Sequence, residues 1–374
     1  MTAAKRTHKH EKLARIYDDE ILPIWSHRFG RLLLRDIDVP PRAMVLDVAC
    51  GTGYPALEML RRLDDQSRLI AIDASSAMLD MARRKAGDLS GKRVFFRTET
   101  IETRLSFTDD VYDLVVCNLG LSELPQPARA FREFVRVAKP GGKVACTLPL
   151  AGTWGEFYDI YREVLVKHDK VAMLERLDAH LKLFPEPEEL ERWSEDAGLV
   201  DARVELDEFA LLFRSSREFF FAPVVEYGPL SSWKEIAGSK GQELQDVFWA
   251  IKQAIDAYFG ERAFQITVKV GCVRGTKPLT PPEPKPREDG QGTGSRAGPA
   301  DEDLISVNTG EVEVLEVRPA WPESSETSAS SDSPEIDEES KPEPCDEPEE
   351  ELEAFKEGAP PRSEEGSEGG KPGV

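Results

Sequence analysis

Short, almost wholly apolar runs alternate with helical stretches from residue 43 onward. The apolar runs cover 44–49, 68–73, 93–98, 112–118 and 142–149. Between them, the segments 55–64, 76–86 and 127–138 place apolar residues at the three- and four-residue spacing of an amphipathic helix. Strands that are buried on both faces have this nearly continuous apolar character. The alternation predicts an α/β fold built on a doubly wound, mostly parallel sheet.

The pattern changes after residue 150, where helical periodicity dominates. It runs through 155–168, 170–183 and 186–198 and returns over 216–259. Two strand-like segments, 202–213 and 264–273, bring the predicted sheet to seven strands of Rossmann-like type. A further helical segment, 8–35, precedes the first strand, and we expect a kink at Pro23.

The C-terminal quarter of the chain has a different composition. From Thr276 onward there are 27 acidic and 9 basic residues, so this part carries −18 of the total charge of −22 and leaves −4 for the rest. Runs such as 346–353 offer too little apolar surface to offset the entropy of folding. The sequence predicts a folded body over 1–275 and a disordered, acidic Pro/Glu/Ser-rich tail over 276–374. The acidic balance also argues against a nucleic-acid partner that is bound by bulk charge.

Neither a membrane segment nor a metal site is indicated. No apolar stretch approaches the ~20 residues that cross a bilayer, and the basic N-terminus lacks the apolar core of a secretory signal. The five cysteines are scattered and form no C-x-x-C pair, which argues against a disulfide framework or a zinc site. We therefore expect a cytoplasmic protein with no metal and no stable membrane insertion.

The strongest chemical signal lies in residues 45–60, which read VLDVACGTGYPALEML. A buried strand carries Asp47, a loop of small residues follows, and a helix comes next. Gly51 and Gly53 let the backbone of this loop approach a ligand. Asp73 ends the second strand, where a carboxylate can bind both ribose hydroxyls of an adenosine cofactor.

Two kinds of cofactor compete for this loop. Residues 51–56, GTGYPA, also fit the dinucleotide pattern of nicotinamide-dependent oxidoreductases. A dinucleotide would set its pyrophosphate against Asp47, at a cost of roughly 1 to 4 kcal/mol at ~4 Å. S-adenosyl-L-methionine has no phosphate, and an acid would attract its ammonium and sulfonium groups. A tight strand-to-helix turn without any ligand is a further interpretation.

Four motifs together resemble the class I S-adenosylmethionine-dependent methyltransferases. They are VLDVACGTG, LIAIDASSAML, VYDLVVCNLGLSEL and RVAKPGGKV, in the order and at the spacing of that family. The resemblance covers most of 10–275 and implies an enzyme that uses S-adenosyl-L-methionine. It also implies an N-terminal helical cap over 1–40, a cofactor-binding core over 41–150, and acceptor-binding helices with the last two strands over 151–275.

The resemblance implies cofactor contacts at the carboxyl ends of the first, second and fourth strands. Asp73 would bind the ribose, and Ala74 and Met78 would border the adenine. The contacts to the methionine portion would come from Asp47, Ala49, Gly51, Gly53, Asn118 and Leu119. The family usually has glycine at the position of Ala49. An alanine fits there if its φ is negative; with a positive φ its methyl group would crowd the cofactor. The family often has an acid near the adenine, directly after the third strand. Glu99 and Glu102 are both candidates, and the distance of Glu102 from residues 105–107 favours Glu102.

The fourth-strand motif bears on the acceptor. Residues 118–124, NLGLSEL, lack the Asn-Pro-Pro-aromatic turn of methyltransferases that act on adenine or glutamine, so neither is expected as the substrate. Glu123 is a candidate general base, or merely begins the next helix. The region after residue 150 loosely resembles the biotin-pathway methyltransferases that act on malonyl carrier protein, and quinone, lipid and secondary-metabolite enzymes share parts of it. We expect a small-molecule or carrier-bound acceptor.

Other residues are candidates for the acceptor side. Tyr17 resembles the aromatic member of a pair that folds over the cofactor in this group, or is an ordinary residue of an amphipathic helix. His180 and Arg214 can meet an acceptor carboxylate. Aromatic residues that can wall an apolar pocket, or simply pack in the core, are Trp25, Trp154, Phe184 and Phe219–Phe221. The catalytic candidates are therefore Glu123, Tyr17 and His180.

A non-catalytic scaffold on this fold is the rival from another functional class. In it the acidic tail would bind a protein partner, with 303–321 as the candidate docking strand because its apolar residues alternate.

Overall fold

A computed structural model describes residues 3–280 except 102–103, 239–240 and 261, with side chains from His8 onward. Of the tail predicted over 276–374, only the first five residues are described. Glu102 and the segment 303–321 lie outside the described residues.

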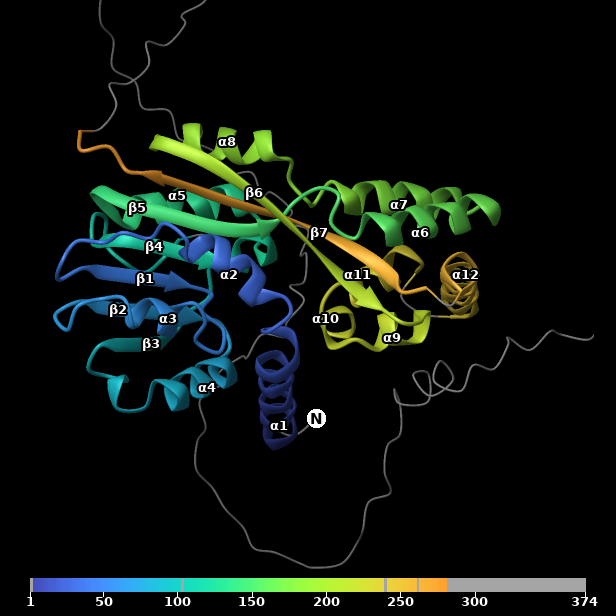
Figure 1. Ribbon diagram of the computed structural model, residues 1–374, viewed down its shortest axis with the longest axis horizontal. Helices are drawn as coiled ribbons and strands as arrows, with labels where there is room; N and C mark the ends of the chain where they lie inside the picture. Colours follow the sequence, from blue (N-terminus) through green and yellow to red (C-terminus); the bar gives the residue numbers. More distant parts are fainter. Residues whose placement is uncertain (1–2, 102–103, 239–240, 261, 281–374) are drawn as a thin grey trace, which may run out of the picture. The chain divides into compact units, whose positions relative to one another are not determined.

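A seven-stranded sheet forms the centre of the fold (Figure 1). In spatial order its strands are β3 (Val94–Thr98), β2 (Arg68–Asp73), β1 (Met44–Val48), β4 (Tyr112–Asn118), β5 (Ala138–Pro149), β7 (Phe264–Thr276) and β6 (Val200–Phe213). The first five are parallel to one another, and β7 is antiparallel to both of its neighbours. This confirms the predicted doubly wound, mostly parallel, seven-stranded sheet. The chain order reverses between β1 and β4, which is where such sheets bind ligands beyond the carboxyl ends of their strands.

Helices flank the sheet and build the region after β5 (Figure 1). Up to β5 they are α1 (Ala3–Ile16), the π-helix η1 (Tyr17–Ile21), α2 (Ser26–Leu34), α3 (Ala56–Leu60), α4 (Ser76–Ala86), the 3₁₀ turns η2 (Gly87–Leu89) and η3 (Gly120–Glu123), and α5 (Pro127–Val137). After β5 they are α6 (Gly155–Lys167), α7 (Val171–Leu181), α8 (Pro187–Asp196), α9 (Ser216–Phe221), α10 (Pro223–Glu226), α11 (Leu230–Ile236) and α12 (Gln242–Phe259). The break between η1 and α2 contains Pro23, as expected.

Two of the element boundaries that differ from the prediction affect the sheet and its first crossover. The helix predicted over 55–64 ends at Leu60, because the Asp64 carboxylate accepts backbone N–H groups of Arg42, Gln66 and Ser67 and so stabilises a loop instead. The strand predicted from residue 142 begins at Ala138, and its register with β4 shifts between Tyr112 and Leu114.

The helix α2 lies across β4, β5 and β7, on the face opposite α5 and α8 (Figure 1). Phe29, Leu32 and Leu33 on α2 are fully or almost fully buried. Arg274 of β7 holds the end of this helix, because its guanidinium donates a hydrogen bond of 2.8 Å to the carbonyl of Leu32 and pairs with Glu205 at 3.0 Å. The sheet thus fixes α2, whose first residues lie in the candidate site.

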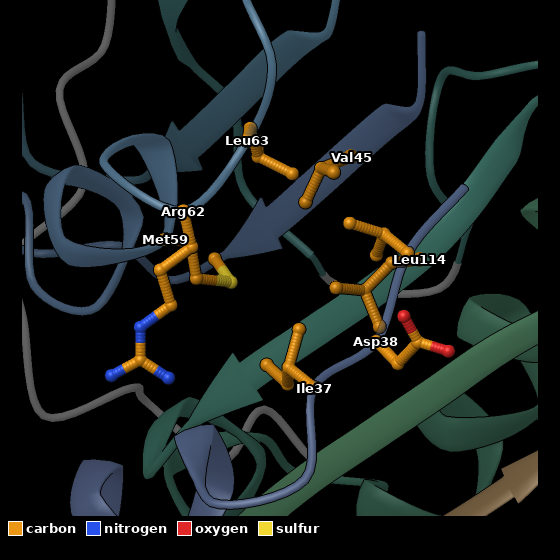
Figure 2. A pocket seen from close by; sticks show the side chains of 8 residues that line it. Ile37, Asp38, Val45, Met59, Arg62, Leu63 and Leu114 are labelled. Atoms are coloured by element: carbon orange, nitrogen blue, oxygen red, sulfur yellow. The ribbon is translucent and has the colours of Figure 1, made fainter. Parts of the chain in front are cut away.

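A cavity of about 120 Å³ lies at the amino ends of β1 and β4 (Figure 2). Its lining is mostly apolar and includes Val45, Met59 and Leu114. The Arg62 guanidinium at its edge is already engaged, since it donates to the carbonyl of Leu34 and pairs with Glu58. The cavity lies at the end of these strands that is opposite the loop after β1, and we assign it no function.

No helix in the described part of the chain is long and apolar enough to cross a bilayer.

Candidate functional site

Asp47, next to last in β1, has no accessible surface. No donor among the described residues meets hydrogen-bond geometry with either carboxylate oxygen, although the backbone N–H of Ala56 is close enough to interact with the carboxylate. Burial raises the pKa of Asp47 well above its ordinary value, the N–H of Ala56 opposes this rise, and the nearby carboxylate of Asp73 adds to it. A buried acid without a partner destabilises the fold unless a ligand brings a positive charge or a hydrogen-bond donor.

Asp73 ends β2 beside the same loop. One carboxylate oxygen accepts the N–H of Gly51 at 2.8 Å, and the other accepts the N–H of Ser75 at 2.8 Å. Burial raises the pKa of Asp73, and these two hydrogen bonds counteract the rise. Asp73 therefore fixes the loop after β1 relative to the start of α4.

Tyr17 covers this loop from the N-terminal segment. The nearest atom of its ring would lie 3.5 Å from a Cβ placed on Gly51. Its hydroxyl and that of Ser26, the first residue of α2, are 2.8 Å apart. Burial raises the pKa of Tyr17 to about 12, so the phenol is neutral at physiological pH. Tyr17 lies in η1, and π-helical turns are frequent at functional sites.

Asp18 fastens the same segment to the loop. Its carboxylate accepts a hydrogen bond of 2.5 Å from the hydroxyl of Thr52 and pairs at 2.6 Å with the ammonium of Lys85 on α4. Because Asp18 is largely buried and Lys85 is about one-third exposed, salt screens this pair only in part. The N-terminal segment is thus tied to both the loop and α4.

The end of β4 joins α2 to β5. The side-chain amide of Asn118 donates to the carbonyl of Ser26 at 3.2 Å and accepts from the hydroxyl of Thr147 at 2.7 Å. The next residue, Leu119, has φ of +70° and donates its N–H to the carbonyl of Thr147 at 3.0 Å. The sequence predicted that the backbone at these two positions contacts the methionine portion of the cofactor. The hydrogen bonds by which the Asn118 side chain joins α2 to β5 had no signal in the sequence.

Glu123 is the last residue of η3. Its side chain is exposed, yet desolvation by the surrounding protein raises its pKa. A carboxylate with a raised pKa is better matched to taking a proton near neutral pH.

The expected adenine contacts follow Asp73 directly. Ala74 is exposed and Met78, in the first turn of α4, is half-buried. The Ser75 hydroxyl caps this helix by accepting the N–H of Met78 at 3.4 Å.

Of the two acids considered after β3, only Glu99 is described. Its carboxylate pairs with Arg97 and accepts the N–H of Ser106 at 2.8 Å. Glu99 therefore ties the residue after β3 to Ser106, while Glu102 lies outside the described residues.

His180 belongs to an aromatic cluster after β5. Its Nε2 lies 2.9 Å from the hydroxyl of Tyr158, which accepts a hydrogen bond from the indole of Trp233 at 3.0 Å. Burial lowers the pKa of His180, which favours a neutral ring. The side chain of Arg214 is exposed.

The expected aromatic wall is only partly accessible. Trp25 stacks on Trp154 with ring centroids 5.5 Å apart, and Trp154 continues through Phe219 into the cluster. Trp154, Phe219 and Phe220 are buried, whereas Trp25, Phe184 and Phe221 are half-buried. Half of this wall packs the core, which leaves the three half-buried rings as surface available to a ligand.

Ala49 does not keep the negative φ under which alanine replaces glycine without strain. Its φ is +59°, and its Cβ would lie 2.3 Å from a Cβ placed on Gly120. The methyl group of Ala49 therefore packs closely against Gly120 in the turn after β4.

Comparison with known proteins agrees with this geometry. Residues 45–142 match the family described as "Methyltransferase domain". The demethylmenaquinone methyltransferase of Staphylococcus aureus is 28% identical over 207 residues, which cover 52% of this chain and 82% of the relative. The chain is a class I S-adenosylmethionine-dependent methyltransferase.

Two solved structures also align with part of this chain, both with TM-scores below 0.5. The YcgJ protein of Bacillus subtilis aligns with a TM-score of 0.46 and 16% identity over 67% of this chain and 99% of the other. A phosphoethanolamine N-methyltransferase of Haemonchus contortus, in complex with S-adenosyl-L-methionine, aligns with a TM-score of 0.39 and 17% identity over 68% of this chain and 52% of the other.

The residues of this methyltransferase fit its cofactor, S-adenosyl-L-methionine. The unpartnered carboxylate of Asp47 suits the ammonium of the methionine portion, and would repel the phosphates of a dinucleotide. Gly51 and Gly53 have φ of +53° and +100°, so the loop bends without side chains that would block the ligand.

We expect Asp47→Asn to stabilise the ligand-free methyltransferase at pH 7. Below pH ~4 the carboxyl of Asp47 is protonated in both the folded and the unfolded chain, so wild type and variant should differ little. As the pH rises, the unfolded carboxyl ionises first, because the folded pKa is raised above 3.8, and the wild type loses stability. The asparagine of the variant does not titrate. The difference in free energy of unfolding between variant and wild type therefore grows by about 1.4 kcal/mol for each pH unit, up to the pKa of Asp47 in the folded protein.

Urea unfolding of both proteins between pH 4 and 8 measures this difference. An advantage that is absent at pH 7, or that shrinks as the pH rises, would contradict the assignment of a destabilising buried charge.

Proposed function

We propose that this methyltransferase transfers the methyl group of S-adenosyl-L-methionine to a small apolar acceptor by direct in-line attack. The observation that carries the proposal is the pair of acids at the carboxyl ends of adjacent strands beneath Tyr17, namely the buried Asp47 and the half-buried Asp73. In this proposal residues 1–40 cover the cofactor, 41–150 bind it, and 151–275 shape the acceptor side.

Each of the two acids, Asp47 and Asp73, binds a different part of the cofactor. Asp47 binds the ammonium group, whose charge compensates the cost of burying the carboxylate. Asp73 binds the ribose: an ionised carboxylate has about four lone-pair sites, and the N–H groups of Gly51 and Ser75 occupy two of them. Ala74 and Met78 lie against the adenine.

Tyr17 and Asp18 close the site from above. The ring of Tyr17 excludes water from the loop, while the contacts of Asp18 with Thr52 and Lys85 hold the segment in place. The segment has to release the loop for the cofactor to enter and close again afterwards. Holding donor and acceptor in line supplies roughly 7 to 11 kcal/mol of barrier reduction.

The sulfonium of the bound cofactor supplies an activated methyl group, so the protein has to orient the acceptor and remove its proton. Glu123 is the proposed general base, because it is accessible and its pKa is raised. The acceptor's proton passes to the Glu123 carboxylate as the acceptor takes the methyl group. Orientation and proton removal are the only tasks left to side chains, which accounts for the lack of any other catalytic signal.

An apolar acceptor fits the surroundings better than a carboxylate-bearing one. The neutral His180 is engaged with Tyr158, so it offers no positive charge to an acid such as a malonyl group. Trp25 and Phe184 offer half-buried aromatic surface instead. The Staphylococcus aureus relative is named for demethylmenaquinone, and reduced demethylmenaquinone is therefore the first acceptor to test.

Asp73→Ala should weaken binding of S-adenosylhomocysteine by at least ~30-fold. Hydrogen bonds to a charged group contribute about 1.5–3 kcal/mol each, and 1.4 kcal/mol is a factor of ten in affinity. Isothermal titration calorimetry measures the effect. Asp80→Ala, which removes an exposed carboxylate paired with Arg83, is the matched control and should bind like wild type. Equal affinities for wild type and Asp73→Ala would exclude the ribose assignment.

Glu123→Gln should lower kcat for reduced demethylmenaquinone by about 10²- to 10⁴-fold, because the general base is lost. Its affinity for S-adenosylhomocysteine should stay unchanged. Wild-type kcat should fall as the pH drops through the raised pKa of Glu123, whereas the variant should lack that limb. Glu58→Gln, at a half-buried position on α3, serves as the control.

Full activity of Glu123→Gln would remove this residue from the mechanism. Turnover of malonyl carrier protein but not of the quinol would reject the apolar acceptor.

A further inference from the structure

Two neighbouring strands lead into residues with the same unusual backbone conformation. Ala49 follows β1 with φ of +59°, and Leu119 follows β4 with φ of +70°. The strands are paired in parallel up to Val48 and Cys117. Non-glycine residues seldom adopt this conformation, so two of them side by side need a reason in their surroundings.

The reason lies in the contact between Ala49 and Gly120. A Cβ on Gly120 would lie 2.3 Å from the Cβ of Ala49, 3.7 Å from its Cα and 3.1 Å from the Sγ of Cys117. The methyl group of Ala49 thus occupies the space that the missing side chain of Gly120 leaves open. A methyl group has no rotamer by which it could move away, so this contact joins two stretches of backbone directly.

Both stretches are held on their other sides. Next to Ala49, the N–H of Cys50 donates to the carbonyl of Ile72 at 3.0 Å, and the N–H of Gly51 donates to Asp73. Beyond the contact, the carbonyl of Leu119 accepts both the N–H and the hydroxyl of Ser122, at 3.2 and 2.7 Å. The turn after β4 leads through η3 to Glu123.

We propose that Ala49 is a positioning residue, which sets the spacing between the cofactor loop and the turn that carries Glu123 through its methyl contact with Gly120. This inference rests on the proposed function. In-line transfer requires the acceptor and the methyl donor to be aligned closely, so a change of this spacing acts on kcat as well as on cofactor affinity. The alanine is therefore an adaptation of this chain that is matched by the glycine opposite.

A reciprocal exchange of the methyl group tests the proposal. Gly120→Ala alone should place two Cβ atoms in the space of one and weaken S-adenosylhomocysteine binding at least 10-fold. Ala49→Gly alone should keep that affinity within about threefold but lower kcat for reduced demethylmenaquinone about 10-fold, with little change in KM. The double variant Ala49→Gly/Gly120→Ala moves the methyl group across the contact and should recover affinity to within about threefold of wild type.

Gly155→Ala is the matched control, because a Cβ there would meet nothing within 4 Å, and it should behave like wild type. Thermal unfolding establishes that each variant is folded before it is titrated. Gly120→Ala with wild-type affinity, or a folded double variant that binds no better than Gly120→Ala, would overturn the positioning role. Failure of the wild type itself to bind S-adenosylhomocysteine would instead overturn the proposed function and this inference with it.

Discussion

The rest of the site depends on one unfavourable interaction, the burial of the Asp47 carboxylate without a partner. The protein accepts this cost inside its central sheet, where a neutral side chain would be more stable. A second acid, Asp73, lies close enough to raise its pKa further. Such an arrangement makes sense when the missing positive charge arrives with the ligand. In the proposed function, the ammonium group of S-adenosyl-L-methionine offsets the cost of burying this carboxylate.

The N-terminal segment and α2 cover the loop after β1 and so shield the Asp47 carboxylate from water. Tyr17 lies over the loop, its hydroxyl reaches Ser26, and the carbonyl of Ser26 is bound by Asn118. Asn118 in turn contacts Thr147 on β5, so the covering segment is connected to two strands of the sheet. The far end of α2 is held by Arg274. The covering segment is therefore part of the packed fold, through its contacts with α2 and with the ends of β4 and β5.

The sheet and the cofactor loop could be predicted from the sequence because their signals are local: apolar runs, small residues and an acid near the end of each of the first two strands. The contacts that assemble the site could not, since they join distant residues: Thr52 and Asp18 are 34 positions apart, and Asn118 and Ser26 are 92 apart. Backbone conformation was equally hidden, since the positive φ of Ala49 goes with a close contact to Gly120 in the turn after β4. The shortened α3 has a similar cause in loop hydrogen bonds that apolar periodicity does not reveal.

The charge pairing at Asp47 is tested most directly by comparing two ligands on two proteins. S-adenosylhomocysteine carries the ammonium group, and 5′-methylthioadenosine shares its adenosine and sulfur but lacks it. Calorimetric titration of wild type and Asp47→Asn should show at least a 10-fold loss of affinity for S-adenosylhomocysteine and less than a twofold loss for 5′-methylthioadenosine. Equal losses for both ligands, or none for S-adenosylhomocysteine, would contradict the pairing of the buried acid with the cofactor's ammonium group.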